Sequence, residues 1–268
     1  MTIQEQAMQS LEDILSVVRA KIAAAAARAG RRADDVEIIA VTKTHGEEVV
    51  REAWEAGLRI VGENKVQEAM WKKAQSLSGP EWHLIGHLQS NKVRHALETF
   101  DFIHSVDSVK LADKINQVAD QMGSRPRILF EVNVSGEKSK SGMPPEAVAD
   151  AIAHVMESCP RITLEGFMTM APICEEQEEA RPFFRRLRLL RDEMEARFNA
   201  SFPRLSMGMS GDYEVAVEEG ATWVRLGTVL FGERPKVKAM RREGDGDDVP
   251  LGGLDSYSGA GPTVRVLD

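Results

Sequence analysis

The stretch that decides the fold is Glu37-Ile38-Ile39-Ala40-Val41-Thr42-Lys43, a short apolar run that ends in an amine. Apolar and β-branched residues in a run of this length predict a buried strand. A lysine at the end of a strand is ordinarily a solvated side chain, so Lys43 carries no argument by itself. It becomes informative through the pattern around it, in which strand-like and helix-like segments alternate along the chain.

Eight segments are predicted as strands, at 37–42, 58–61, 82–85, 101–104, 127–133, 162–168, 204–207 and 222–226. Helical patterns lie near 46–56, 64–77, 90–99, 108–122, 145–157, 175–199 and 212–219, and a long helix over 3–29 precedes them all. Eight strands, each followed by a helix or the start of one, predict a single α/β domain, a (β/α)8 TIM barrel over 1–235. A doubly wound open sheet gives the same alternation and is the alternative. Residues 236–268 are rich in Gly and Asp without periodicity, which predicts a flexible tail.

Composition excludes several functional classes. The 268 residues are 43% hydrophobic and 28% charged, as in ordinary soluble globular proteins, and the net charge is −8. An acidic chain of this kind is not expected to bind nucleic acid or an anionic membrane surface. No apolar run reaches the roughly 20 residues that span a bilayer. The N-terminus lacks a signal pattern, and Cys159 and Cys174 show no metal or redox spacing, so we expect a cytoplasmic protein.

The barrel hypothesis places the notable polar residues at one end. Functional groups of such barrels lie at the C-terminal ends of the strands, and phosphate often binds after the seventh and eighth. Lys43 follows the first strand, Ser210 and Gly211 follow the seventh, and Gly227 and Thr228 follow the eighth. Because the eighth strand of a closed barrel adjoins the first, these residues can face one ligand. An amine opposite phosphate-binding loops predicts a ligand with an aldehyde and a phosphate, of which pyridoxal 5'-phosphate (PLP) is the common one.

Three of the polar residues allow two interpretations each. Arg225 sits at the end of the eighth strand, where an interior arginine needs a partner. That partner is either the ring nitrogen of a pyridine or a neighbouring carboxylate. Ser210 either binds phosphate or simply caps the helix at 212–219. We expect His83 to be a hydrogen-bonded core histidine rather than a metal ligand, because no second ligand stands at zinc spacing.

The chain also resembles a known family, the PLP homeostasis proteins, also called the YggS or PROSC family. Seven strings carry the resemblance in order over about residues 5–234: AVTKT, GENKVQE, WHLIGHLQSNK, EVNVSGEKSKSG, GFMTMAP, LSMGMSGDYE and VRLGTVLFG. Each string alone is weak, but seven in the same order make chance similarity remote.

The resemblance implies a single barrel similar to the N-terminal domain of alanine racemase, with PLP as an internal aldimine on Lys43. The residues it implies for the rest of the cofactor are Ser210, Gly211, Gly227 and Thr228 for the phosphate, Arg225 for the ring nitrogen, and Asn64 beside the cofactor. It matches Lys140 to a family lysine implicated in PLP transfer or secondary binding. The sequence departs from the family pattern at His45 and Gly46.

Members of that family are regarded as PLP carriers without established catalysis, with PLP-dependent apoenzymes as partners. The main rival interpretation is a fold-type III PLP enzyme such as an amino-acid racemase. Such enzymes add a β-domain, for which the residues after the barrel are too few, and a racemase uses a tyrosine that neither Tyr213 nor Tyr257 matches. A lysine-dependent aldolase would need a carboxylate beside Lys43, and the sequence places none there. We therefore expect a monomeric, non-catalytic PLP carrier.

Overall fold

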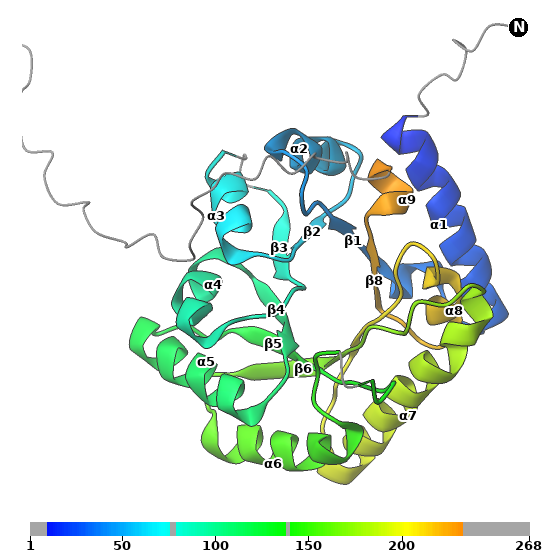
Figure 1. Ribbon diagram of the computed structural model, residues 1–268. Coiled ribbons are helices and arrows are strands. Elements are labelled where there is room, and N and C mark those ends of the chain that lie inside the picture. The colour runs from blue at the N-terminus through cyan, green and yellow to red at the C-terminus, as the bar shows by residue number, and fades with distance from the viewer. Residues whose placement is uncertain (1–9, 76–78, 138–139, 233–268) are drawn as a thin grey trace, which may run out of the picture. The chain divides into compact units, whose positions relative to one another are not determined.

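The computed structural model describes residues 10–75, 79–137 and 140–232 and shows a closed barrel of parallel strands paired in chain order (Figure 1). Its strands are β1 (Glu37–Val41), β2 (Ile60–Glu63), β3 (Glu81–Leu84), β4 (Phe102–Val106), β5 (Arg127–Glu131), β6 (Thr163–Met168), β7 (Arg204–Ser206) and β8 (Trp223–Leu226). Pairing of β1 with β8, with Ile39 opposite Arg225, closes the barrel. The predicted barrel is thus confirmed, and the open sheet is excluded.

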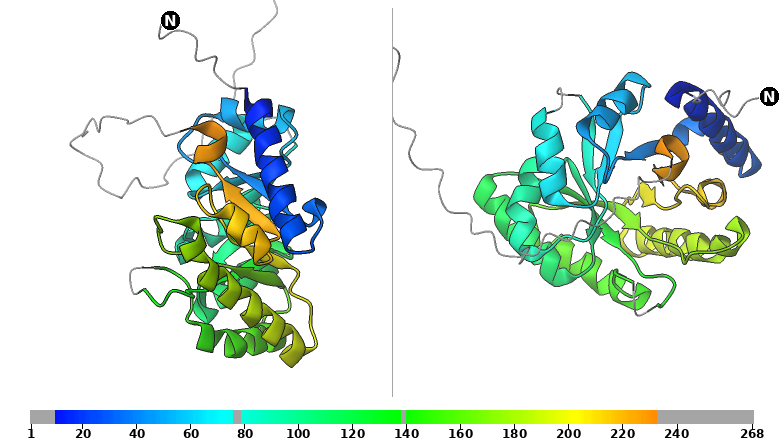
Figure 2. Two further views of the ribbon diagram at one scale, coloured as in Figure 1. Left: turned by 90° about the vertical axis from the view of Figure 1, so that its right-hand side faces the viewer. Right: turned by 45° about the horizontal axis from the view of Figure 1, so that its top comes forward.

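Helices surround the barrel as an outer ring (Figure 1). They are α1 (Leu11–Arg28), α2 (Glu47–Glu55), α3 (Val66–Gln75), α4 (Val93–Thr99), α5 (Val109–Met122), α6 (Val148–Ser158), α7 (Arg181–Phe198), α8 (Tyr213–Glu218) and α9 (Thr228–Phe231). The last of these is a single turn. Helix α1 lies alongside α8 and α9 in both orientations (Figure 2), and Arg28 Nε donates to Glu218 Oε1 at 2.6 Å. The N-terminal helix therefore completes the wall where the helix after β8 is short.

Some helix boundaries differ from the sequence predictions. The first helix begins at Leu11, after Ser10 accepts a hydrogen bond from the N–H of Asp13; residues 3–9 of the predicted helix lie outside the described ranges. The helix predicted over 175–199 begins at Arg181, behind a 3-10 turn at Gln177–Ala180. Further 3-10 turns occupy Ala33–Asp35, Ser90–Lys92 and Pro145–Ala147. Helix α9 was not predicted because four residues are too few to show a period. The predicted tail over 236–268 also lies outside the described residues and stays a prediction.

The inside of the barrel is layered, because inward-facing side chains recur at every second position of each strand. An ion cluster occupies the N-terminal end of the strands. Arg127 bridges Glu81 at 2.9 Å and Glu165 at 2.6 Å, and Arg204 bridges Glu37 at 2.9 Å. An apolar layer comes next and consists of Ile39, Ile60, Phe102, Leu129, Met168 and Trp223. Within the described residues, no helix is long and apolar enough to cross a membrane.

Candidate functional site

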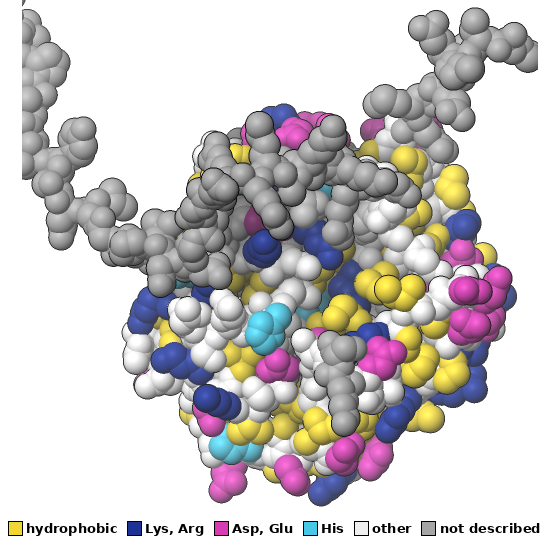
Figure 3. Space-filling model, in the orientation of Figure 1, with side chains coloured by type: hydrophobic (Ala, Val, Ile, Leu, Met, Phe, Trp, Pro, Cys, Tyr) yellow, Lys and Arg dark blue, Asp and Glu magenta, His cyan; other side chains and the backbone are white. Residues whose placement is uncertain are grey.

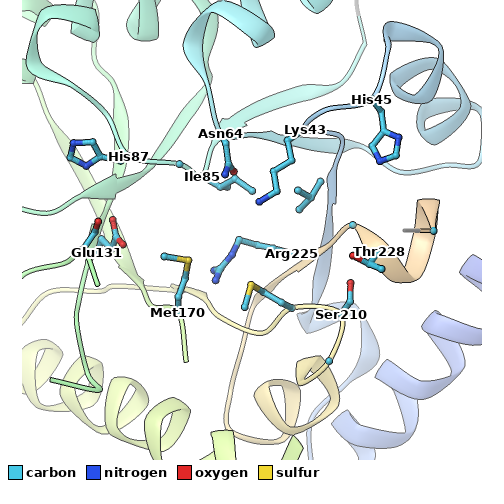
Figure 4. A pocket seen from close by; sticks show the side chains of 17 residues that line it. Lys43, His45, Asn64, Ile85, His87, Glu131, Met170, Ser210, Arg225 and Thr228 are labelled. Atoms are coloured by element: carbon cyan, nitrogen blue, oxygen red, sulfur yellow. The ribbon is translucent and has the colours of Figure 1, made fainter. Parts of the chain in front are cut away.

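A cavity of about 400 Å³ opens at the C-terminal ends of the strands, where the barrel architecture predicts function. The seven residues predicted to bind the cofactor all line it: Lys43, Asn64, Ser210, Gly211, Arg225, Gly227 and Thr228. Dark-blue Lys and Arg side chains are visible near the centre of this face in the space-filling view (Figure 3). In the close-up, the side chains of Lys43 and Arg225 reach into the same space from different strands (Figure 4).

An ion cluster around the buried side chain of Lys72 contacts the backbone next to Lys43. Lys72 of α3 is only 1% exposed, and its Nζ lies 2.7 Å from Glu63 Oε1 and 2.8 Å from Glu68 Oε1. We call Lys72, Glu63 and Glu68 the Lys72 cluster. Burial raises the pKa of Glu63, and the hydrogen bonds from Lys72 and Thr42 oppose that rise. A buried charge is tolerated only when it is paired and hydrogen-bonded, so this cluster is a rigid feature of the fold.

The Lys72 cluster holds the backbone on both sides of Lys43. Before it, the carbonyl of Thr42 accepts from Lys72 Nζ at 2.8 Å, and the Thr42 hydroxyl donates to Glu63 at 2.6 Å. After it, the N–H of Thr44 donates to Glu68 Oε1 at 2.5 Å. Thr44 has a φ of 68°, a left-handed conformation that a β-branched residue adopts only when its surroundings impose it. The backbone position of Lys43 is thus held by the contacts of its neighbours Thr42 and Thr44.

Ser210 connects the loop after β7 with α9, and the interpretation that it caps the helix at 212–219 is wrong. Helix α8 begins at Tyr213, and Asp212 is its N-cap residue. Ser210 Oγ instead accepts the N–H of Val229 at 3.2 Å, so the loop after β7 is tied to α9. Ser210 and Thr228 consequently lie at the same end of the cavity (Figure 4).

Gly208 and Gly211 both lie in the loop after β7, but the structure requires glycine only at the first of these positions. Gly208 has a φ of +92°, and a Cβ there would come 2.5 Å from Ala216 Cβ, so the fold itself requires glycine. Gly211 meets no such obstacle, because a Cβ would find no protein atom within 4 Å. The fold alone does not require glycine at 211, and its absent side chain leaves room for a ligand against the backbone.

Arg225 is held by neutral partners. The side chain is 5% exposed, and Nη1 donates to both the carbonyl and the hydroxyl of Ser206, each at 2.7 Å. Nη2 donates to the carbonyl of Thr169 at 2.8 Å. Arg225 forms no ion pair with a described residue, so the carboxylate partner considered from the sequence is not found. Burial lowers the pKa of Arg225 to about 10. Three of the five guanidinium N–H groups are engaged, which leaves two for a ligand.

The cavity also contains groups that sequence reasoning missed. Glu131 is 3% exposed and lies on the other side of the cavity from Ser210, near His87 (Figure 4). Burial raises the pKa of Glu131 to about 7, with a further rise from Asp107 and an opposing effect of Arg225. The predicted strand ran to residue 133, which hid this carboxylate at the true strand end. The signal was present as a single acid inside the run Ile128-Leu129-Phe130-Glu131-Val132.

Other sequence interpretations can be placed as well. His83 is a buried, hydrogen-bonded histidine, as predicted, with His104 Nε2 at 2.9 Å from its Nδ1. Tyr213 is buried and does not line the cavity, consistent with its exclusion as an acid/base residue. Lys140 Nζ pairs with Glu137 at 3.2 Å and is not part of the cavity lining, so its role stays a prediction.

Comparison with known proteins connects this geometry to a family. Residues 15–235 match the family model described as alanine racemase, N-terminal domain. A pyridoxal phosphate homeostasis protein of Aquifex aeolicus is 45% identical over 222 residues, which cover 82% of this chain and 96% of that protein. The chain belongs to this family. Its Pseudomonas aeruginosa member is 42% identical over 228 residues, which cover 85% of this chain and 97% of that one. The family resemblance carried by the seven strings is confirmed.

Solved structures agree with the family assignment. PipY of Synechococcus elongatus, with PLP bound, is 36% identical, superposes with a TM-score of 0.73, and is matched over 83% of this chain and 100% of PipY. An alanine racemase of Clostridium difficile superposes with a TM-score of 0.68 at 16% identity. It is matched over 86% of this chain and only 58% of the racemase, and at this identity it shows the fold alone.

Proposed function

We propose that this chain binds PLP in the cavity through Lys43 and acts as a PLP carrier in cellular PLP homeostasis. The observation that carries the proposal is the convergence of three kinds of group on one cavity. Lys43 provides an amine, the Ser210 and Thr228 loops provide donors for a phosphate, and Arg225 offers two N–H groups. PLP has an aldehyde, a phosphate and a ring nitrogen, so each group has a counterpart.

The fit extends to size and surroundings. A volume of about 400 Å³ is within the range of cavities that hold a small cofactor. The apolar side chains of Val41, Ile85 and Met170 line the same cavity and suit the faces of an aromatic ring. An arginine with no bound carboxylate would donate to an unprotonated pyridine nitrogen and keep it unprotonated. PLP supplies an aldehyde that bonds covalently to a primary amine, and Lys43 is the amine that the fold presents to it.

A carrier is favoured over an enzyme by what surrounds Lys43. None of the described residues that line the cavity is a tyrosine, the group that a racemase of this fold would need. The relatives that match nearly their whole length are named as homeostasis proteins, and PipY has been described with PLP bound. We propose PLP-dependent apoenzymes as partners and a cytoplasmic location, where the free thiols of Cys159 and Cys174 remain reduced.

The proposal is tested by following PLP rather than a reaction product. Protein loaded with PLP is mixed with an apoenzyme that requires it, and recovery of the apoenzyme's activity is measured. We expect transfer from the wild type, weak binding of pyridoxal without its phosphate, and no racemisation or decarboxylation of common amino acids above a Lys43→Ala control. Turnover of an amino acid that depends on Lys43 would replace the carrier with an enzyme. Binding of pyridoxal as tightly as PLP would remove the phosphate loops from the proposal.

A further inference from the structure

Behind Arg225, a chain of polar side chains runs through the interior of the barrel. Arg225 Nη1 donates to Ser206 Oγ at 2.7 Å, and that hydroxyl lies 2.9 Å from His104 Nδ1. His104 Nε2 lies 2.9 Å from His83 Nδ1, and His83 Nε2 faces Glu81 Oε1 at 3.3 Å. This last contact is longer than the others, and His83 Nε2 makes no aligned hydrogen bond within the described residues. We call this series the Arg225 chain.

The Arg225 chain connects the cavity with the ion cluster at the opposite end of the barrel. Ser206, His104 and His83 are each 0% exposed, and they come from β7, β4 and β3. His104 stacks on Trp223 of the apolar layer, with ring centroids 5.0 Å apart. Burying three polar side chains beside the apolar layer costs free energy, which their hydrogen bonds to one another only partly offset. Their arrangement therefore requires an explanation beyond packing.

Arg225 sets the direction of the hydrogen bonds in the Arg225 chain, and the carboxylate of Glu81 at the other end agrees with that direction. A guanidinium can only donate, so Ser206 Oγ accepts from Arg225, and its hydroxyl hydrogen is directed to His104 Nδ1. His104 then carries its proton on Nε2 and donates to His83 Nδ1. His83 in turn carries its proton on Nε2, facing Glu81, which can only accept. The reverse order would direct a histidine lone pair at the Glu81 carboxylate and leave the Ser206 hydrogen without an acceptor.

Both histidines must be neutral for this order to hold. A positively charged His104 would donate from both nitrogens and could no longer accept from Ser206. Burial is the largest cause that lowers the pKa of each histidine, and for His104 the nearby His83 and Arg225 add to it. The Arg225 chain is therefore a series of neutral side chains whose hydrogen bonds all run in one direction, and it begins at one nitrogen of Arg225.

We propose that Ser206, His104 and His83 are positioning residues for PLP. They hold the Arg225 guanidinium, which reaches into the cavity (Figure 4), in the orientation in which its remaining N–H groups would serve the ring nitrogen of a bound PLP. The inference rests on the proposed PLP site and adds the residues that set its geometry. It predicts that substitutions in the Arg225 chain weaken the contact with the ring nitrogen of PLP and leave the contacts with the phosphate and the aldehyde unchanged.

The test compares PLP with its 1-deaza analogue, in which a carbon that cannot accept a hydrogen bond replaces the ring nitrogen. His104→Phe removes both hydrogen bonds of the ring and should weaken PLP binding about tenfold, the loss of about one such bond, with the deaza analogue little affected. His104→Gln keeps an acceptor for Ser206 and a donor for His83, and should restore the preference for PLP. His95→Phe is the matched control, because the His95 side chain is 43% exposed and lies outside the Arg225 chain.

A second measurement observes the two histidines directly in the wild-type protein. In wild-type protein labelled with ¹⁵N-histidine, His104 and His83 should both be neutral at pH 7 with the proton on Nε2. The proposed order of hydrogen bonds is overturned if either histidine carries its proton on Nδ1 or is charged.

Ser206→Ala is a smaller change that covers the case in which His104→Phe does not fold. It should also lower the preference for PLP over the deaza analogue.

The outcomes separate this inference from the function on which it rests. If the wild type does not bind PLP, the proposed function fails. If the wild type prefers PLP to the deaza analogue and His104→Phe or Ser206→Ala keeps that preference unchanged, the function stands and the positioning role is wrong.

Discussion

Two anchors of one cavity are supported by opposite physical means. Lys43 is fixed by the Lys72 cluster, in which a buried ammonium meets two carboxylates at 2.7 and 2.8 Å. Arg225 is fixed by carbonyls, a hydroxyl and, through the Arg225 chain, two histidines. The first support is ionic and the second is neutral, although both hold nitrogen-bearing side chains that reach into the same cavity.

Under the proposed function, the difference follows from what each of the two residues would do. As the amine that would bond to PLP, Lys43 keeps its side chain directed at the cavity, while the Lys72 cluster holds the backbone of Thr42 and Thr44 on either side of it. Arg225 must keep spare N–H groups, so a carboxylate that would occupy its fork is unsuitable beside it. The ionic support should therefore be the more damaging one to break, because an unpaired buried charge remains.

The largest effect is expected from Lys72→Met. The substitution leaves Glu63 buried without its counter-charge, which should lower the free energy of unfolding by about 3–5 kcal/mol. Chemical denaturation of the PLP-free protein measures it. The exposed Lys110→Met should change stability by no more than about 0.5 kcal/mol.

A paired change distinguishes charge from packing in the Lys72 cluster. Adding Glu63→Gln to Lys72→Met removes the orphan charge and should recover part of the lost stability. A loss below about 1 kcal/mol for Lys72→Met alone would show that the cluster is not the ionic support described here.

Glu131 extends the comparison, because this buried cavity carboxylate has neither kind of support among the described residues. Its pKa is raised from 4.5 to about 7, so its contribution to stability is full below pH 4.5 and is lost as the pH rises through 7. Relative to wild type, Glu131→Gln should therefore gain about 2–3 kcal/mol between pH 5 and pH 8. Urea unfolding of the PLP-free proteins at the two pH values measures the gain. If the stability difference between the two proteins is the same at both pH values, the pKa of Glu131 is not raised.

A smaller effect is expected at the phosphate end, where a single hydroxyl is removed. Ser210→Ala should cost one hydrogen bond to a charged group, about 1.5–3 kcal/mol, and thus lower PLP affinity roughly 10- to 150-fold. Titration of the PLP absorbance measures the change, with the exposed Ser158→Ala as control. Unchanged affinity would mean that Ser210 serves only to hold Val229.

The sequence was sufficient to predict the barrel and seven of the residues that line its cavity, though not Glu131. Lys43, Ser210 and Thr228 could be placed because strand ends converge at one end of a closed barrel, a rule that needs no side-chain detail. Boundaries were less certain at α7, whose predicted start preceded Arg181 because a 3-10 turn continues the same helical pattern.

The supports behind the anchors could not be read from the sequence. Lys72 stands four residues after Glu68 on α3, the spacing of an ordinary exposed ion pair, and only the packing of α3 buries it. His83 and His104 belong to different strands, and nothing in their spacing predicts that their rings meet at 2.9 Å inside the barrel. Such contacts depend on strand register, which local patterns do not specify.

The central claim is that Lys43 is the residue that binds PLP covalently, and it can be tested by reduction and peptide mapping. The purified protein is incubated with PLP, treated with borohydride, digested and analysed by mass spectrometry. The account predicts a pyridoxyl-phosphate label on the peptide that contains Lys43 and loss of the label in Lys43→Ala. A label on another lysine, with Lys43 unmodified, would contradict it.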